Sequence, residues 1–148
     1  MKKILSILLI LCICLLPLCA GCADKTTASV DLDLSVMSST IVYAEMYNIQ
    51  YDPGQYLGKV IRMRGLYSFF REPSTGVVYY ACVVPDATAC CMQGIEFVWA
   101  GEHAWPEDYP EPTTEITVTG RLEEYDEDGV PYLHLVDAEM TVLPAGNE

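Results

Sequence analysis

Residues 59–67 read Lys-Val-Ile-Arg-Met-Arg-Gly-Leu-Tyr, and this stretch decides the fold. Ile61 and Met63 lie on one side of an alternating pattern, and two arginines lie on the other side. A period of two residues is typical of a β-strand that buries one face. Gly65 stands inside the pattern, and an interior glycine allows a strand to bend tightly. We therefore expect a strongly curved strand here.

Four later stretches also have the patterns of strands. One is a continuous run of β-branched and aromatic residues, as expected for a strand that is largely buried on both faces. The other three alternate, and the turn between the last two contains Asp128-Gly129, a strong signal for a hairpin. The four stretches are Val77–Val84 (the continuous run), Ile95–Trp99, Ile116–Leu122 and Tyr132–Val142, the last with an irregularity near Asp137.

Together these five strands predict an all-β fold. Gly120, like Gly65, lies inside a strand, and interior glycines suit the tight curvature of a small closed barrel. The spacing of the strands shows no parallel crossover pattern. We therefore expect a small five-stranded antiparallel barrel with a short helical segment in front of it.

Helix is expected only before the first strand. Residues 40–48 place Ile41, Ala44 and Met46 along one side at helical spacing, although their β-branched content makes a strand nearly as good an interpretation. Asp52-Pro53 suits the start of a short helical turn, because Asp can cap the first amides and Pro fits the first helical position. Gly58 can end that turn in the left-handed conformation.

The first 22 residues have the form of an export signal. Two lysines precede an apolar run, Ile4–Leu18, that is shorter than the roughly 20 residues of a membrane span. Ala20-Gly21-Cys22 then resembles the bacterial lipobox, although Cys19 takes the place of its usual leucine. We expect residues 1–21 to be a signal peptide and Cys22 to carry diacylglycerol, with acyl chains such as palmitate. The alternatives are an ordinary secreted protein and an uncleaved anchor.

These boundaries divide the rest of the chain into three segments. Residues 22–37 are polar with little apolar repetition and are expected to form a flexible tether. Residues 38–143 form the predicted barrel domain, and residues 144–148 form a C-terminal tail. The expected location is the bacterial cell membrane, with the domain lipid-anchored and facing outside the cytoplasm.

The composition limits the partners of the domain. The chain has a net charge of −13, and cleavage after residue 21 would remove two lysines and no acidic residue. Nucleic acid is therefore excluded as a partner, because lysine and arginine must replace the counterions on phosphate. An anionic membrane surface gives no attraction either, so attachment depends on the lipid.

Two segments carry a resemblance to a known family. Tyr56–Gly65 and Glu115–Gly120 resemble the oligonucleotide/oligosaccharide-binding (OB) fold of small bacterial lipoproteins without an assigned function, and the resemblance covers residues 50–143. Cys90-Cys91 is similar to a Cys-Cys motif in the extracytoplasmic part of permease-associated membrane proteins. That motif continues with Ala-Ala-Asp, whereas Met92-Gln93-Gly94 follows here. OB domains bind many kinds of ligand, so the resemblance implies a binding fold without naming a ligand.

Three cysteines remain in the predicted domain, and an odd number cannot pair completely within one chain. Cys82 lies in an apolar strand, and Cys90 and Cys91 lie in the following connection. Four interpretations are open. The cysteines pack as small apolar residues, or Cys82 forms a disulfide with one of the pair. Alternatively, the three thiolates and His103 bind zinc, or a cysteine takes part in redox catalysis.

Two functions follow from these features. The first is a non-enzymatic binding or accessory module for an unknown protein or small ligand, without a cofactor. The alternative is a zinc-handling lipoprotein that uses Cys82, Cys90, Cys91 and His103. An enzyme is not expected, because the sequence shows no nucleophile with a base partner. Trp105 and the residues around it suggest either a lid over a binding face or a cover for one end of the barrel.

The lipid prediction is tested at Cys22. Mass spectrometry of the mature protein is expected to find a diacylated Cys22 at the N-terminus. Cys22→Ala should release the protein from membranes or change its processing, because diacylation supplies the second acyl chain that stable attachment needs. An unmodified N-terminus at another residue would contradict the prediction.

Overall fold

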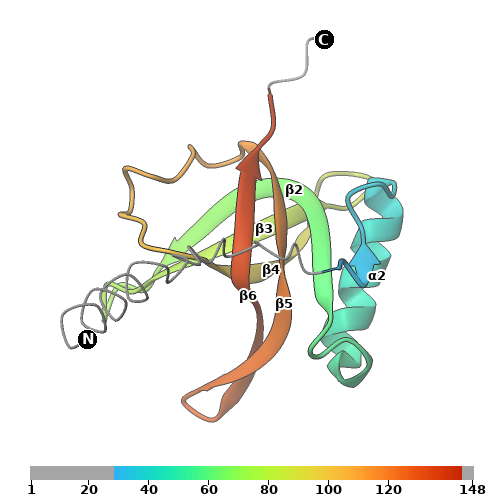
Figure 1. Ribbon diagram of the computed structural model, residues 1–148, viewed down its shortest axis with the longest axis horizontal. Coiled ribbons are helices and arrows are strands. Elements are labelled where there is room, and N and C mark those ends of the chain that lie inside the picture. The colour runs from blue at the N-terminus through green and yellow to red at the C-terminus, as the bar shows by residue number, and fades with distance from the viewer. Residues whose placement is uncertain (1–28, 145–148) are drawn as a thin grey trace, which may run out of the picture.

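The structure, a computed structural model, describes residues 29–144 (Figure 1). The predicted signal peptide, the lipid site at Cys22 and residues 145–148 lie outside this range. The fold is mostly β, as expected, with one α-helix and one turn of 3-10 helix. The elements are β1 (Leu32–Asp33), α2 (Ser39–Tyr51), η1 (Pro53–Gln55), β2 (Val60–Arg71), β3 (Val78–Pro85), β4 (Met92–Trp99), β5 (Glu115–Glu127) and β6 (Val130–Val142).

The strands form one six-stranded sheet in the order β1-β2-β3-β4-β6-β5, and β2 also pairs with β5. Five of these strands match the predicted ones, but the expected number of five is wrong because β1 adds a sixth. The expected antiparallel arrangement is also wrong for two pairs, since β1–β2 and β4–β6 are parallel. The β4–β6 pair is parallel because β5 carries the chain back before β6 begins, so β6 runs in the direction of β4.

Strand β1 corrects the prediction that residues 22–37 are entirely a tether. Asp31 donates its amide to the Val60 carbonyl at 2.8 Å, and Leu34 donates to Arg62 at 2.7 Å. The Leu34 side chain is buried in the core. The main chain therefore joins the edge of β2, and the folded domain begins at about Asp31 rather than at residue 38.

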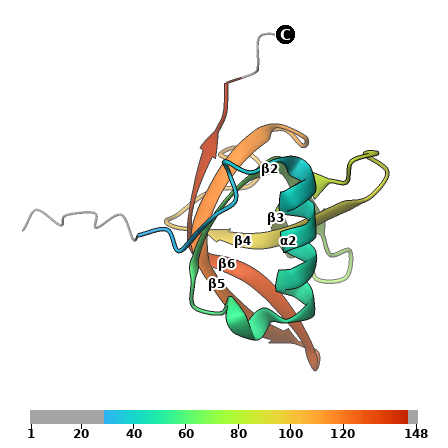
Figure 2. The same ribbon diagram turned by 90° about the vertical axis from the view of Figure 1, so that its right-hand side faces the viewer.

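The helix prediction is confirmed, but of the three residues expected on its apolar side only Met46 is buried. Val42, Met46 and Ile49 are buried, whereas Ile41 is 55% exposed. These three residues are spaced four and three apart, which places them on one face of the helix. Through that face α2 packs against β3 and β4, and Figure 2 shows the helix standing across the strands.

The short turn after α2 also differs in detail from its prediction. Pro53 occupies the start of η1 as expected, but the Asp52 side chain makes no capping hydrogen bond. It accepts instead from the Gln55 side-chain amide at 2.7 Å. Gly58 has a φ of +80°, as expected for a left-handed stop.

Interior glycines allow the strands to approach one another closely. An added Cβ at Gly65 would lie 2.5 Å from the Val83 carbonyl oxygen, and one at Gly94 would lie 2.3 Å from the Cys82 carbonyl oxygen. At Gly120 it would lie 2.9 Å from the Leu135 Cβ. The apolar core fills the space that the strands and α2 enclose, and it includes Leu34, Met46, Ile61, Met63, Tyr67, Cys82, Ile95, Phe97, Ile116, Val118, Leu122 and Leu135.

In the part of the chain that the structure describes, no helix combines the length and apolar character needed to span a membrane.

Val118→Asp tests the facing of β5. Val118 is fully buried, and the adjacent Thr117 is only partly buried on the opposite face. Val118→Asp should lower the free energy of unfolding by about 3–5 kcal/mol, because an unpaired charge would be buried. Thr117→Asp is the matched control, with a much smaller expected effect. Chemical denaturation measures both, and equal losses would contradict the facing of the strand.

Candidate functional site

Cys82 is a core residue. Its side chain is fully buried in β3, and burial raises the pKa of its thiol to about 12. The Cys82 sulfur lies against Gly65 of β2. A Cβ atom added to Gly65 would lie only 2.9 Å from this sulfur. The structure therefore supports packing for this cysteine and keeps it neutral.

The other two cysteines lie in the loop between β3 and β4. Cys90 and Cys91 are exposed, and their sulfur atoms are 3.6 Å apart. All three cysteines of the described residues are free thiols. The groups gathered close together are the two thiols and Asp86, whose metal-binding atoms lie within 4.8 Å of one another. Sequence reasoning missed Asp86.

His103 lies with a different set of side chains. Its ring stacks on the Trp99 indole with centroids 3.5 Å apart, and Nε2 is 3.0 Å from the Ala100 carbonyl oxygen. The structure thus does not bring Cys82 and His103 into the cluster formed by Cys90, Cys91 and Asp86.

The aromatic residues of the β4–β5 connection cover the adjoining core. Tyr109 stacks on Tyr80 at 4.1 Å and packs against the core residues. Trp105 meets Phe69 edge-on at 5.3 Å. Desolvation by burial raises the pKa of Tyr109 well above its ordinary value. These contacts support the interpretation that Trp105 and its neighbours cover the core, rather than forming a lid over a binding face.

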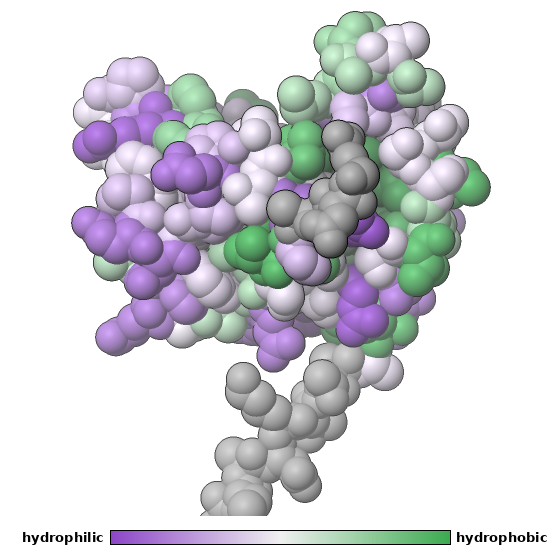
Figure 3. Space-filling model, turned by 90° about the horizontal axis from the view of Figure 1, so that it is seen from above, coloured by the Kyte–Doolittle hydropathy of each residue, from purple (hydrophilic) through white to green (hydrophobic). Residues whose placement is uncertain are grey.

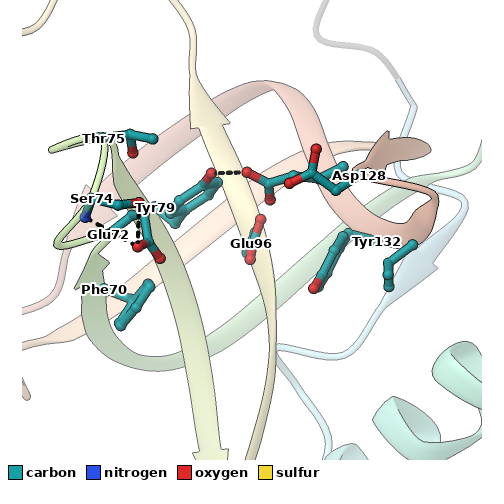
Figure 4. Close-up of a pocket in the computed structure, with 10 residues that line it drawn as sticks. Phe70, Glu72, Ser74, Thr75, Tyr79, Glu96, Asp128 and Tyr132 are labelled. Carbon is teal, nitrogen blue, oxygen red and sulfur yellow. Dashed lines mark hydrogen bonds between the residues drawn. The ribbon is translucent and has the colours of Figure 1, made fainter.

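A groove of about 460 Å³ lies on the outer surface of β3 and β4. The buried residues of β3 are Cys82 and Val84, so Tyr79 projects from the other face of this strand. Glu96 lies between two buried residues of β4 and also projects outward. Figure 4 shows Tyr79 and Tyr132 on either side of Glu96. The full lining is Phe70, Glu72, Ser74, Thr75, Tyr79, Glu96, Glu127, Asp128, Val130 and Tyr132.

Two turns frame the groove. The β2–β3 turn is held by a hydrogen bond from the Glu72 amide to the Val77 carbonyl, and Ser74 donates its hydroxyl to Glu72 at 2.8 Å. On the other side, Asp128 and Gly129 both have positive φ and make the two-residue hairpin that the sequence predicts. Carboxylates from both turns thus lie at the groove.

Two of the four carboxylates of the groove, Glu96 and Glu127, accept hydrogen bonds from tyrosine hydroxyls. Tyr79 donates to Glu127, and the hydroxyl of Tyr125 on strand β5 donates to Glu96 at 2.7 Å. The hydrogen bond to Glu127 raises the pKa of Tyr79 to about 12, because the charged acceptor stabilises the neutral phenol. The rings are thereby fixed beside the carboxylates.

The arginine ion pairs of the described residues lie elsewhere. Arg62 pairs with Asp33, Arg64 pairs with Glu115, and Arg121 pairs with two carboxylates on β5 and β6. The residues that line the groove include four carboxylates and neither lysine nor arginine. The groove therefore carries concentrated negative charge.

Seen from above, hydrophilic side chains cover most of the left of the molecule, while hydrophobic ones form separate patches across the centre and right (Figure 3).

A second, more apolar groove of about 340 Å³ adjoins the first. It shares Tyr79 and Glu96 with the first groove and extends to Trp99, Tyr125 and His134. The two hollows together form a longer surface over β3 and β4.

Sequence reasoning missed the acidic groove. The alternation in β4 does place Glu96 outward, and the Asp-Gly turn places Asp128 at a strand end. The sequence alone does not show that Glu96 and Asp128 lie in the same groove, because this depends on the order of the strands in the sheet. The comparisons add no assignment, because neither the models of known protein families nor the curated proteins gave a match.

The pairing of Tyr79 with Glu127 can be tested by titration. Glu127→Gln should return the pKa of Tyr79 from about 12 toward its ordinary value of 10.0, because the charged acceptor is removed. NMR of isotope-labelled tyrosine measures this change. Glu139→Gln, which alters a carboxylate outside the groove lining, is the control and should leave the titration of Tyr79 unchanged. An unchanged pKa in Glu127→Gln would contradict the geometry.

Proposed function

We propose that this protein is a lipid-anchored, extracytoplasmic binding module without enzymatic activity, built on an OB-like barrel. The pairing of β2 with β5 supports the barrel, because it joins the two ends of the run β2-β3-β4-β6-β5. The export signal with Cys22 supports the anchor.

The observation that carries the binding function is the acidic groove on β3 and β4. OB folds bind ligands on the face of their second and third strands, between the loops that flank it. When β2 is counted as the first strand of the barrel, those strands are β3 and β4. The flanking loops are then residues 72–77 and the Asp128-Gly129 turn, and both contribute to the groove lining.

The groove suits an organic cation that also has an apolar part. Its four carboxylates, Glu72, Glu96, Glu127 and Asp128, have no basic residue beside them in the lining and would repel nucleic acid and other anions. Three aromatic rings, from Phe70, Tyr79 and Tyr132, lie in the same lining. Aromatic faces attract amines and guanidinium groups through cation–π interactions, and the carboxylates reinforce this attraction. An ammonium group beside Glu96 would thus meet both kinds of contact.

A matched pair of probes tests this proposal. Phenylethylamine should bind the full chain and shift the NMR signals of groove residues, whereas uncharged phenylethanol, of the same shape, should bind much more weakly. Glu96→Gln should weaken binding of the amine by up to about fivefold, since a solvent-accessible ion pair contributes up to about 1 kcal/mol. Glu139→Gln is the control variant and should not change the affinity.

Equal binding of the amine and the alcohol would show that charge does not govern recognition. Shifts confined to residues outside the groove, or none for either probe, would overturn the assignment of the groove as the binding site.

A further inference from the structure

The loop between β3 and β4 brings three metal-binding groups together on the surface. The Cys90 and Cys91 sulfur atoms are 3.6 Å apart, and the Cys90 sulfur is 3.3 Å from Oδ2 of Asp86. All three donor atoms lie within 4.8 Å of one another. Two soft thiolates and a carboxylate are a donor set that suits zinc.

Two of the three separations between these atoms are close to those in a zinc tetrahedron. Zinc binds thiolate sulfur at about 2.3 Å and carboxylate oxygen at about 2.0–2.2 Å. A tetrahedral ion with those bond lengths separates two sulfur ligands by about 3.8 Å and a sulfur from an oxygen by about 3.6 Å. The observed 3.6 Å and 3.3 Å are shorter than these separations by about 0.2 Å and about 0.3 Å. The third separation, between the Cys91 sulfur and the Asp86 carboxylate, is at most 4.8 Å, so zinc would require side-chain movements of about 1 Å.

Hydrogen bonds already orient the carboxylate. Oδ1 of Asp86 accepts from the backbone amides of Thr88 and Cys90, each at 3.0 Å, which leaves Oδ2 turned toward the Cys90 thiol. Partners of this kind fix the direction of a metal ligand and increase its affinity.

The backbone of the loop is fixed as well. The Asp86 amide donates to the Cys91 carbonyl at 2.8 Å, and the register pairs Pro85 with Met92 at the strand ends directly before and after the loop. The three ligands are therefore supplied by a closed hairpin loop.

We propose that Asp86, Cys90 and Cys91 form an open zinc(II) site. Binding displaces the two thiol protons to solvent and forms two zinc–sulfur bonds and one zinc–oxygen bond. Because both thiols are exposed, the fourth ligand position faces solvent and accepts water or a donor from another molecule. Three protein ligands with an open position are typical of zinc sites that exchange a ligand, in contrast to closed structural sites.

This site differs in two ways from the zinc site that the sequence suggests. The buried Cys82 and the stacked His103 are not ligands, and Asp86 takes their place. The site also goes beyond the proposed function, because none of its three ligands lines the acidic groove. Either proposal can therefore fail without the other.

Cobalt(II) and zinc(II) titrations of the reduced full chain in detergent test the site. Sulfur-to-cobalt charge-transfer absorption reports thiolate ligation. The double variant Cys90→Ser/Cys91→Ser should lose part of the absorption seen in the wild type, and that part should correspond to one metal ion per chain. Zinc should displace the cobalt. Calorimetry in buffers of different ionisation enthalpy should show release of about two protons per zinc in the wild type, relative to the double variant.

Two single variants separate the proposed ligands from the other thiols. Asp86→Asn should weaken zinc binding by more than about tenfold, since even changes around a ligand cost 10–100-fold in affinity. Cys82→Ser should leave the spectrum and affinity unchanged, and circular dichroism verifies that both variants are folded. Equal metal binding by the wild type and the double variant, or loss of the signal in folded Cys82→Ser, would overturn the proposal.

Discussion

The missing side chain at Gly65 is the constraint on which the sheet depends. Strand β2 pairs with β5 up to Leu66 and with β3 from Leu66 onward, so the strand passes from one partner to the other at this point. Any Cβ at Gly65 would collide with the Val83 carbonyl and approach the Cys82 sulfur. The close contact fixes where β3 lies, and β3 in turn positions both the groove and the cysteine loop.

Local patterns predicted most of the β-structure, and non-local contacts supplied the rest. Alternation marked the strand that contains Ile61 and Met63, and an irregularity was expected near Asp137, where φ is +51°. Strand β1 was not predicted, because two residues are too few to show an alternating pattern. Only its pairing with the distant residues Ile61 and Arg62 defines it as a strand. The parallel β4–β6 pair was missed for a related reason, since strand order is a property of the whole sheet.

The candidate sites were less predictable than the fold. Cys82 and the apolar Val84 are two residues apart in a strand and therefore point to the same face, which favoured burial of Cys82. The distance between Cys82 and Cys90 depends instead on the course of the loop. Asp86 is recognisable as a ligand only after the loop folds back and brings it to the thiols. The place of His103 was decided by stacking on Trp99, a tertiary contact without a local signal.

Under the proposed lipid attachment at Cys22, strand β1 would also limit the height of the domain above the membrane. The proposed lipid site at Cys22 precedes Asp31, the first residue hydrogen-bonded to β2, by only nine positions. Nine residues span at most about 30 Å when fully extended. That distance is about the diameter of one small domain. The domain would thus meet its partners only within this layer next to the bilayer, and its own diffusion would be confined to the plane of the membrane.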